Sequence, residues 1–274
     1  MAILYVVATP IGNLQDLSPR AADTLRNADL IIAEDTRVTM KLCQVFDLKA
    51  KLVSCHRHNE DSKAAGLAGK ILEEDLTAAL VTDAGTPCIS DPGERLVRAC
   101  IETGTPFEVL PGASASLTAA IMSGLGTKRI FFVGFLPREN RERAETIAQI
   151  RRVSAVTVLY ESPYRMGATL KELAELLGDR KAAVVREITK LHEETVRGTL
   201  LSLAECFSEE APRGECVIVI SGEAEREEPA ETLDGLLTRL LAEGMSVKDA
   251  AKRAAMLLDV PKSEAYKRAN ELKE

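Results

Sequence analysis

Short runs of apolar residues, each followed by a polar or glycine- and proline-containing segment, recur along the first half of the chain. The runs at residues 3–8, 30–33, 51–55, 78–81 and 107–110 have the length and the Ile, Val, Leu and Ala content of buried strands. Helical patterns fill the stretches between them, and the first one starts at Ser18 and Pro19 as N-cap and first helical residue. Regular alternation of this kind predicts an α/β domain with a mostly parallel sheet.

A second series of the same kind follows Gly126. Strands are predicted at residues 130–135, 156–160, 182–185 and 216–220, with helices between them. Each half has its own buried strands, so we predict two α/β domains, residues 1–115 and 116–224, with a cleft between them. Clefts between domains are common sites for small molecules.

The C-terminal part of the chain has a different pattern. Residues 223–231 hold five acidic side chains and no large apolar one, which is typical of a solvated linker. Residues 232–274 contain three short helical patterns, and two of them across a tight turn resemble a helix-turn-helix. We expect a small helical module here, for which packing or dimerisation is the alternative role.

The stretch VTDAGTPCISDPG, residues 81–93, has the densest set of turn-forming residues in the chain. It follows a predicted strand and precedes a predicted helix, so in a parallel sheet it lies at the carboxyl edge, where ligands bind. Its residues alone leave two readings open, a ligand site and a turn that only reverses the chain.

Charged residues gather after four other predicted strands. They form the clusters Glu34-Asp35-Thr36-Arg37, His56-Arg57-His58-Asn59-Glu60, Tyr160-Glu161-Ser162-Pro163-Tyr164-Arg165 and Arg186-Glu187-Ile188-Thr189-Lys190. The first could instead cap a helix N-terminus, and the two histidines lack an evident third metal ligand. Taken together, the clusters favour a polar substrate site without a metal.

Composition and motifs limit which ligands, cofactors and cellular locations the sequence is compatible with. The net charge is −7, which argues against a surface coated with phosphate-binding groups. No G-x-G-x-x-G or Walker A run is present, so a cofactor without phosphates is favoured. Six scattered cysteines and no long apolar run predict a cytoplasmic protein with reduced thiols and no membrane span.

The order of these motifs resembles the tetrapyrrole methylase superfamily of S-adenosylmethionine-dependent methyltransferases, and within it the branch that methylates ribosomal RNA. The matching segments are LYVVATPIGNLQDLSPRA, AEDTR, HNE, VTDAGTPCISDPG, VLPGASA, GFLP, LYESPYR, REITKLHEE and RGTL, which span residues 4–200. The resemblance implies two α/β domains with S-adenosylmethionine in the cleft, and the C-terminal segment resembles the helix-turn-helix-like appendage of that branch. It further implies 2′-O-methylation of a cytidine in 16S ribosomal RNA within the 30S subunit, by a homodimer.

The resemblance also implies site residues. Cofactor contacts are expected from Pro10, Asp83, Ala84, Gly85, Thr86, Ile89, Ser114 and Ala115. TPIGNLQD replaces the glycine-rich first loop of the wider superfamily, which leaves the contacts of that loop open. A positioned base should assist a ribose hydroxyl, and we assign that role to Asp35 or Glu161. Phosphate or ribose contacts are assigned to Arg37, Arg165 and Lys190.

Two other functions are compatible with parts of the sequence. One is a C-methyltransferase acting on a tetrapyrrole. A macrocycle enclosed in the cleft would not need the C-terminal helical module, which disfavours this function. The other is a helix-turn-helix DNA regulator with a sensory α/β domain. The net charge and the excess of only two basic residues, seven against five, across residues 246–274 disfavour the regulator.

Overall fold

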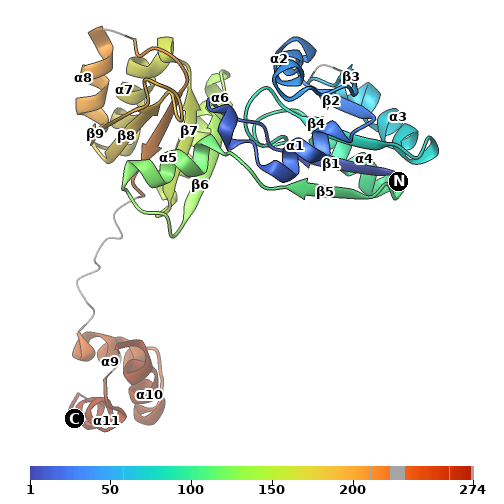
Figure 1. Cartoon of the computed structure of the whole chain (residues 1–274). Coiled ribbons are helices and arrows are strands. Elements are labelled where there is room, and N and C mark those ends of the chain that lie inside the picture. Colours follow the sequence, from blue (N-terminus) through green and yellow to red (C-terminus); the bar gives the residue numbers. More distant parts are fainter. Residues whose placement is uncertain (58, 210, 223–231, 259, 273–274) are drawn as a thin grey trace. The chain divides into compact units, whose positions relative to one another are not determined.

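The computed structural model describes residues 1–57, 59–209, 211–222, 232–258 and 260–272 (Figure 1). The chain divides into two compact units, Met1–Glu223 and Ala224–Glu274. The acidic linker predicted at residues 223–231 lies outside the described residues, as does His58. Among the helices of the described segments, none is long and apolar enough to cross a membrane.

The first unit begins with a five-stranded parallel sheet in the order β3-β2-β4-β1-β5. Its strands are β1 (Ile3–Val7), β2 (Leu30–Ala33), β3 (Lys51–Ser54), β4 (Thr77–Val81) and β5 (Phe107–Leu110). The helices around it are η1 (Leu14–Asp16), α1 (Pro19–Arg26), α2 (Thr36–Phe46), α3 (Glu60–Glu73) and α4 (Glu94–Thr103). The predicted parallel α/β arrangement is therefore confirmed for this half.

The three inner strands β2, β4 and β1 are buried on both faces, which explains why their sequences are almost continuously apolar. Leu30 and Ile32 of β2 pack with residues of α3 and α4, whereas Ile31 and Ala33 pack with residues of α1 and α2. Because all five strands run in the same direction, the loops that follow them meet at one edge of the sheet.

The second sheet of the same unit is mixed, in the order β6-β7-β10-β8-β9. Its strands are β6 (Ile130–Phe135), β7 (Val156–Glu161), β8 (Lys181–Arg186), β9 (Glu194–Thr199) and β10 (Cys216–Ile220). Only β6 and β7 pair in parallel, and β10 runs antiparallel between β7 and β8. The edge strand β9 was not predicted, because its sequence ETVRGT has no apolar run and none of its residues is fully buried.

Helices cover both faces of the second sheet. One face packs on α6 (Asn140–Arg152), α7 (Met166–Leu177) and α8 (Leu200–Glu209), and the other packs on α5 (Ala115–Ser123). Ile11, from the loop after β1, belongs to the α5 cluster, so this loop packs against the core of the second sheet. The predicted boundary between residues 115 and 116 stays a prediction, since both sheets belong to one compact unit.

The second unit contains three helices, α9 (Leu233–Ala242), α10 (Val247–Leu258) and α11 (Lys262–Glu271). Leucines of α9 and alanines of α10 and α11 form its core. Arg268 of α11 makes a two-pronged ion pair with Asp234 of α9, with both N–O distances at 2.6 Å. The three helices predicted within residues 232–274 are therefore confirmed.

Candidate functional site

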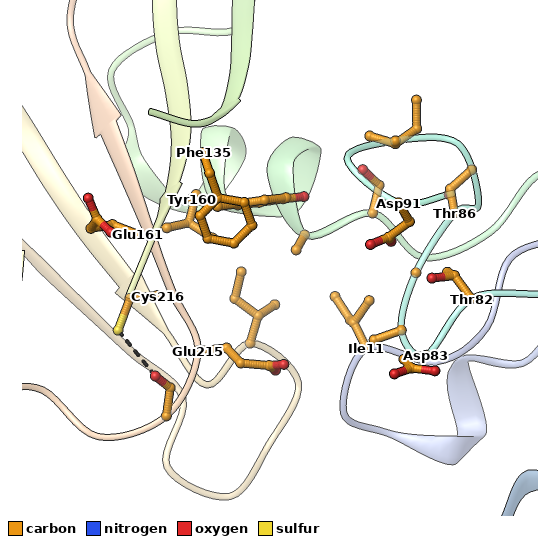
Figure 2. A pocket seen from close by; sticks show the side chains of 18 of the residues that line it. Ile11, Thr82, Asp83, Thr86, Asp91, Phe135, Tyr160, Glu161, Glu215 and Cys216 are labelled. Atoms are coloured by element: carbon orange, nitrogen blue, oxygen red, sulfur yellow. Dashed lines mark hydrogen bonds between the residues drawn. The ribbon is translucent and has the colours of Figure 1, made fainter. Parts of the chain in front are cut away.

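A cavity of about 540 Å³ lies at the carboxyl edge of the first sheet, between its loops and the second sheet (Figure 2). The loops of the first sheet contribute Ile11, Glu34, Thr82, Asp83, Ala84, Gly85, Thr86, Ile89 and Asp91. The second sheet and its loops contribute Phe135, Tyr160, Glu161, Ser162, Pro163, Ile188, Gly214, Glu215, Cys216 and Val217. Ser114 and Ala115, from the segment that joins the two sheets, complete the lining.

The loop after β4 is tied to the loop after β1 by backbone hydrogen bonds. The Thr9 N–H donates to the Gly85 carbonyl at 2.9 Å, and the Gly85 N–H donates to the Thr9 carbonyl at 3.1 Å. Gly85 has φ of 86°, a left-handed conformation that glycine adopts without strain. The Thr86 hydroxyl donates to the Ala113 carbonyl at 3.0 Å. The segments expected to hold the cofactor are thereby fastened to each other.

The remainder of this loop has an unusual backbone. Cys88 and Ser90 have φ of 70° and 67°, a left-handed conformation that is uncommon for residues other than glycine. The buried carboxylate of Glu60, on α3, anchors the end of this loop. It accepts hydrogen bonds from the Gly93 and Arg95 N–H groups at 2.8 and 2.9 Å. This carboxylate caps α4 in place of a side chain at Gly93, so it holds residues 88–93 in one conformation.

Three carboxyl groups, those of Glu34, Asp83 and Asp91, lie on the wall formed by the first sheet. Burial raises the pKa of each above its ordinary value, and the charge of Asp91 raises the pKa of Glu34 further. The Thr82 hydroxyl is a hydrogen-bond partner of both Glu34, at 3.2 Å, and Asp91. It has a single proton to donate, so it satisfies one of these two carboxylates at a time.

Arg57 acts on two of these carboxyls, those of Glu34 and Asp91. Its charge lowers the pKa of each, in opposition to burial, while its Nη2 donates to the Ser90 carbonyl at 3.0 Å. The charge of Arg37 lowers the pKa of Asp83 in the same way. Among the described lining residues there is no Lys, Arg or His, whereas five carry a carboxyl group. The cavity therefore suits a ligand with positive charge and disfavours one with phosphates.

The structure places Asp35 at the N-cap of α2 and outside this lining. Its carboxylate accepts from the Arg37 N–H at 2.8 Å and from the Arg37 guanidinium at 2.6 Å, and these contacts lower the pKa of Asp35 to about 2. Asp35 is connected to the cavity only through its own N–H, which donates to Asp83 at 3.3 Å. A carboxylate with such a low pKa is a weak proton acceptor near pH 7.

Glu161 borders the cavity, but its carboxylate points away from it (Figure 2). Successive side chains of a strand face opposite sides, so Tyr160 faces the cavity and Glu161 faces α7. There the Glu161 carboxylate accepts from Thr169 at 2.7 Å and pairs with Arg165 at 2.7 Å. Neither Glu161 nor Arg165 has its charge free for a ligand in this arrangement.

Lys190 lies in the loop after β8, beside the loop after β1. Its ammonium group contacts Glu187 at 2.8 Å and Glu215 at 2.9 Å. The loops pack so closely that a Cβ on Gly12 would lie 2.6 Å from Lys190 Cγ and 2.8 Å from the Ile188 carbonyl oxygen. Gly12 in the TPIGN segment therefore permits this contact, which closes one side of the cavity.

The expected cofactor residues lie together, with one exception. Asp83, Ala84, Gly85, Thr86, Ile89, Ser114 and Ala115 all line the cavity. Pro10 instead lines a neighbouring cavity of about 230 Å³ beside α2. Sequence reasoning gave no site role to Asp91, Phe135 or Tyr160, although the alternation Tyr160-Glu161 at the end of a strand could have indicated which side chain faces inward.

Comparison with known proteins identifies the family. A family model described as Tetrapyrrole (Corrin/Porphyrin) Methylases matches residues 3–204, and one described as the RsmI C-terminal HTH domain matches residues 227–273. "Ribosomal RNA small subunit methyltransferase I" of Bacillus subtilis is 42% identical over 97% of this chain and 93% of that protein. The protein of the same name from Synechocystis is 43% identical over 99% of both chains.

A solved structure agrees on the fold. The uroporphyrin-III C-methyltransferase of Thermus thermophilus, complexed with S-adenyl homocysteine, superposes with a TM-score of 0.57 at 18% identity, covering 80% of this chain and 96% of that one. The fold, the matched family models and the near full-length relatives agree with one another. The chain belongs to the tetrapyrrole methylase family and, within it, groups with the ribosomal RNA small subunit methyltransferase I proteins.

Proposed function

We propose that the chain transfers a methyl group from S-adenosylmethionine to the 2′-hydroxyl of a cytidine in 16S ribosomal RNA. The names of the relatives support an rRNA substrate, and the bound S-adenyl homocysteine of the Thermus protein supports the cofactor. The observation that carries the proposal is the cavity lining, which has no described basic residue but has the carboxyl groups of Glu34, Asp83, Asp91 and Glu215, besides that of Glu161, which points away. That lining fits a cofactor that is positively charged and has no phosphate.

The residues present fit this cofactor. Ala84 and Thr86 offer backbone polar groups on one side, Gly85 fixes the loop by its hydrogen bonds to Thr9, and Ile11 and Val217 offer apolar surface. When bound, S-adenosylmethionine supplies an electrophilic methyl group on a sulfonium, so the protein has to align groups rather than activate a metal. Alignment of this kind supplies roughly 7–11 kcal/mol of a barrier in well-oriented reactions.

The acceptor hydroxyl has to lose its proton, and we assign that proton to the carboxyl pair of Glu34 and Asp91. Both line the cavity, and burial holds the pKa of each above its usual range, nearer to the pH at which a carboxylate is an effective base. Asp35 and Glu161 stay alternative predictions, but their ion pairs with Arg37 and Arg165 make them weaker acceptors. A positioned base typically contributes ~10²–10⁴ in rate.

The remaining predictions concern partners and organisation. We propose that residues 1–115 and 116–224 form the two walls of the catalytic unit, and that residues 232–274 bind RNA. Arg37 is 88% exposed at its side chain and is placed to contact a phosphate at the rim; Arg165 and Lys190 support the loops that border the cavity. The 30S subunit as substrate, the homodimer and the cytoplasmic location belong to the same proposal.

Methyl transfer from labelled S-adenosylmethionine tests this function. Isolated 30S subunits that lack the modification and a porphyrinogen are offered to the protein in parallel. We expect label in the RNA, recovered as 2′-O-methylcytidine after digestion, and none in the macrocycle. Label in the porphyrinogen alone would instead establish the tetrapyrrole C-methyltransferase.

A further inference from the structure

Phe135 ends β6 with 56% of its surface exposed, although it lines the cavity. Single exposed apolar side chains are common and need no explanation. This one, however, is directed into the cavity by a specific irregularity of the strand and is held by a second aromatic ring. The irregularity is a β-bulge in β6 and the second ring is that of Tyr160.

A β-bulge aims the Phe135 side chain. Phe132 pairs with Val158, but Gly134 pairs with Leu159 and Phe135 with Tyr160, so one extra residue is inserted into β6. Residues three apart in a regular strand face opposite sides. Because of the bulge, Phe132 and Phe135 both face the side of Tyr160, whose ring centroid lies 5.2 and 5.6 Å from theirs.

Tyr160 fixes the orientation of the Phe135 ring. The two planes meet at 62°, an edge-to-face contact that leaves a face of the Phe135 ring uncovered. Figure 2 shows both rings on one side of the cavity, with Thr86 and Asp91 on the opposite side. The cavity thus has an aromatic wall and a carboxyl wall.

The bulge also brings the aromatic wall to the loop that carries Asp91. Gly134 has φ of 70°, and a Cβ at this position would lie 2.8 Å from the Ser90 hydroxyl oxygen. The end of β6 therefore touches residue 90, next to Asp91. The segments expected to hold the cofactor, Ala84–Thr86 and residues 114–115, are instead fastened to the loop after β1 and to Ala113.

Aromatic side chains bind nucleobases through their π-faces, and proteins that read single-stranded RNA use them as platforms. An enzyme that modifies one nucleotide has to separate it from its neighbours before the reacting atom is accessible. A base that stacks on Phe135 would bring its own ribose toward Asp91, the carboxyl assigned to accept the hydroxyl proton. Its phosphates would stay outside, since none of the described lining residues is basic.

We infer that Phe135, held edge-on by Tyr160, is the stacking surface for the acceptor nucleobase and not for the adenine of the cofactor. This inference rests on the proposed function, because it names the part of the RNA that enters the cavity. Phe135 contacts the substrate directly, whereas Tyr160 and Gly134 are positioning residues.

The chain has no tryptophan, so a Phe135→Trp variant carries a single fluorescent reporter at the proposed stacking surface. Short oligocytidylate is titrated into this variant with and without saturating S-adenosylhomocysteine. Saturable quenching by oligocytidylate in both conditions is expected, because a stacked base quenches the indole. Phe107→Trp, on edge strand β5 where Phe107 is 38% exposed, is the matched control and should not be quenched in this way.

Quenching by S-adenosylhomocysteine that leaves no further response to oligocytidylate would overturn the inference, as would the absence of any quenching at Phe135→Trp. A second variant, Phe135→Leu, keeps the apolar volume but removes the ring. It should raise KM for 30S subunits roughly 5- to 150-fold, the range of one lost base stack, with calorimetric S-adenosylhomocysteine affinity unchanged, and Phe135→Tyr should restore KM. An unchanged KM for Phe135→Leu also contradicts the inference. If the wild-type protein does not methylate RNA, the proposed function fails separately, since the quenching titration does not depend on turnover.

Discussion

Replacing Gly85 with alanine tests whether the loop after β4 holds the cofactor. Gly85 has φ of 86°, and forcing a residue with a Cβ into this region costs roughly 1–2 kcal/mol of the free energy of unfolding. The added Cβ would lie 3.3 Å from Ile11 Cγ2 and 3.6 Å from the Ala113 oxygen, so Ile11 must move by a few tenths of an ångström. Both residues lie at or beside the cavity, so the change should reach the bound cofactor.

Gly104 provides a matched control. It has φ of 75° at the end of α4, and a Cβ there would meet nothing within 4 Å. Gly85→Ala and Gly104→Ala should therefore lose similar stability, a melting temperature lower by roughly 2–8 °C for a unit of this size. Only Gly85→Ala should weaken binding of S-adenosylhomocysteine in a calorimetric titration, by about tenfold or more, which corresponds to ~1.4 kcal/mol.

The titration has two results that would refute this reasoning. Unchanged affinity in Gly85→Ala would show that the loop does not contact the cofactor. An equal loss in both variants would show that affinity follows global stability rather than the local geometry of the cavity.

Three further predictions follow from the charges and the two units. Glu34→Gln should be more stable than the wild type at pH 7, because the folded protein loses stability as the pH rises through the raised pKa of Glu34 and the carboxyl ionises. In thermal melts this advantage should vanish below the ordinary pKa of 4.5. A variant less stable than the wild type at pH 7 contradicts this. Asp35→Asn keeps a capping oxygen but lacks the charge that is paired with Arg37. The variant should be less stable than the wild type above pH 3.8, the ordinary pKa of Asp35, and the difference should shrink as the pH falls toward about 2. A difference that does not depend on pH would show that the charge is not responsible. Removing residues 224–274 should weaken binding to 16S RNA in filter assays and leave S-adenosylhomocysteine affinity unchanged, and a collapse of cofactor affinity would show that the helical unit supports the cavity instead.

The parallel half of the fold was predictable from the sequence because strands that are buried on both faces have continuous runs of apolar residues. Every strand of the first sheet except β3 and β5 is almost wholly buried, and the runs that result are followed by turn-forming residues. The edge strand β9 has no such apolar run, since each of residues 194–199 is partly or largely exposed. Its pairing with β8 depends on contacts distant in sequence, which local patterns do not contain.

The candidate site was predictable to the level of the loop but not always of the side chain. The turn-rich stretch at residues 81–93 and Glu34 of the first charged cluster do lie together at the carboxyl edge of the first sheet. Yet adjacent carboxyls have different roles: Asp35 caps a helix and Glu34 faces the cavity. The N-cap position of Asp35, directly before a helical pattern, was a usable signal for this difference. The bulge that aims Phe135 was not predicted, although an isolated glycine such as Gly134 inside a strand pattern is a signal for a bulge.

A crystal structure of the protein with S-adenosylhomocysteine tests the central claim most directly. The ligand should occupy the cavity of about 540 Å³ against Ala84–Thr86 and residues 114–115, with its sulfur open toward Asp91 and with Phe135 left uncovered for the acceptor base. A ligand bound elsewhere, or one whose adenine covers Phe135, or whose sulfur faces Asp35 or Glu161, would contradict the account.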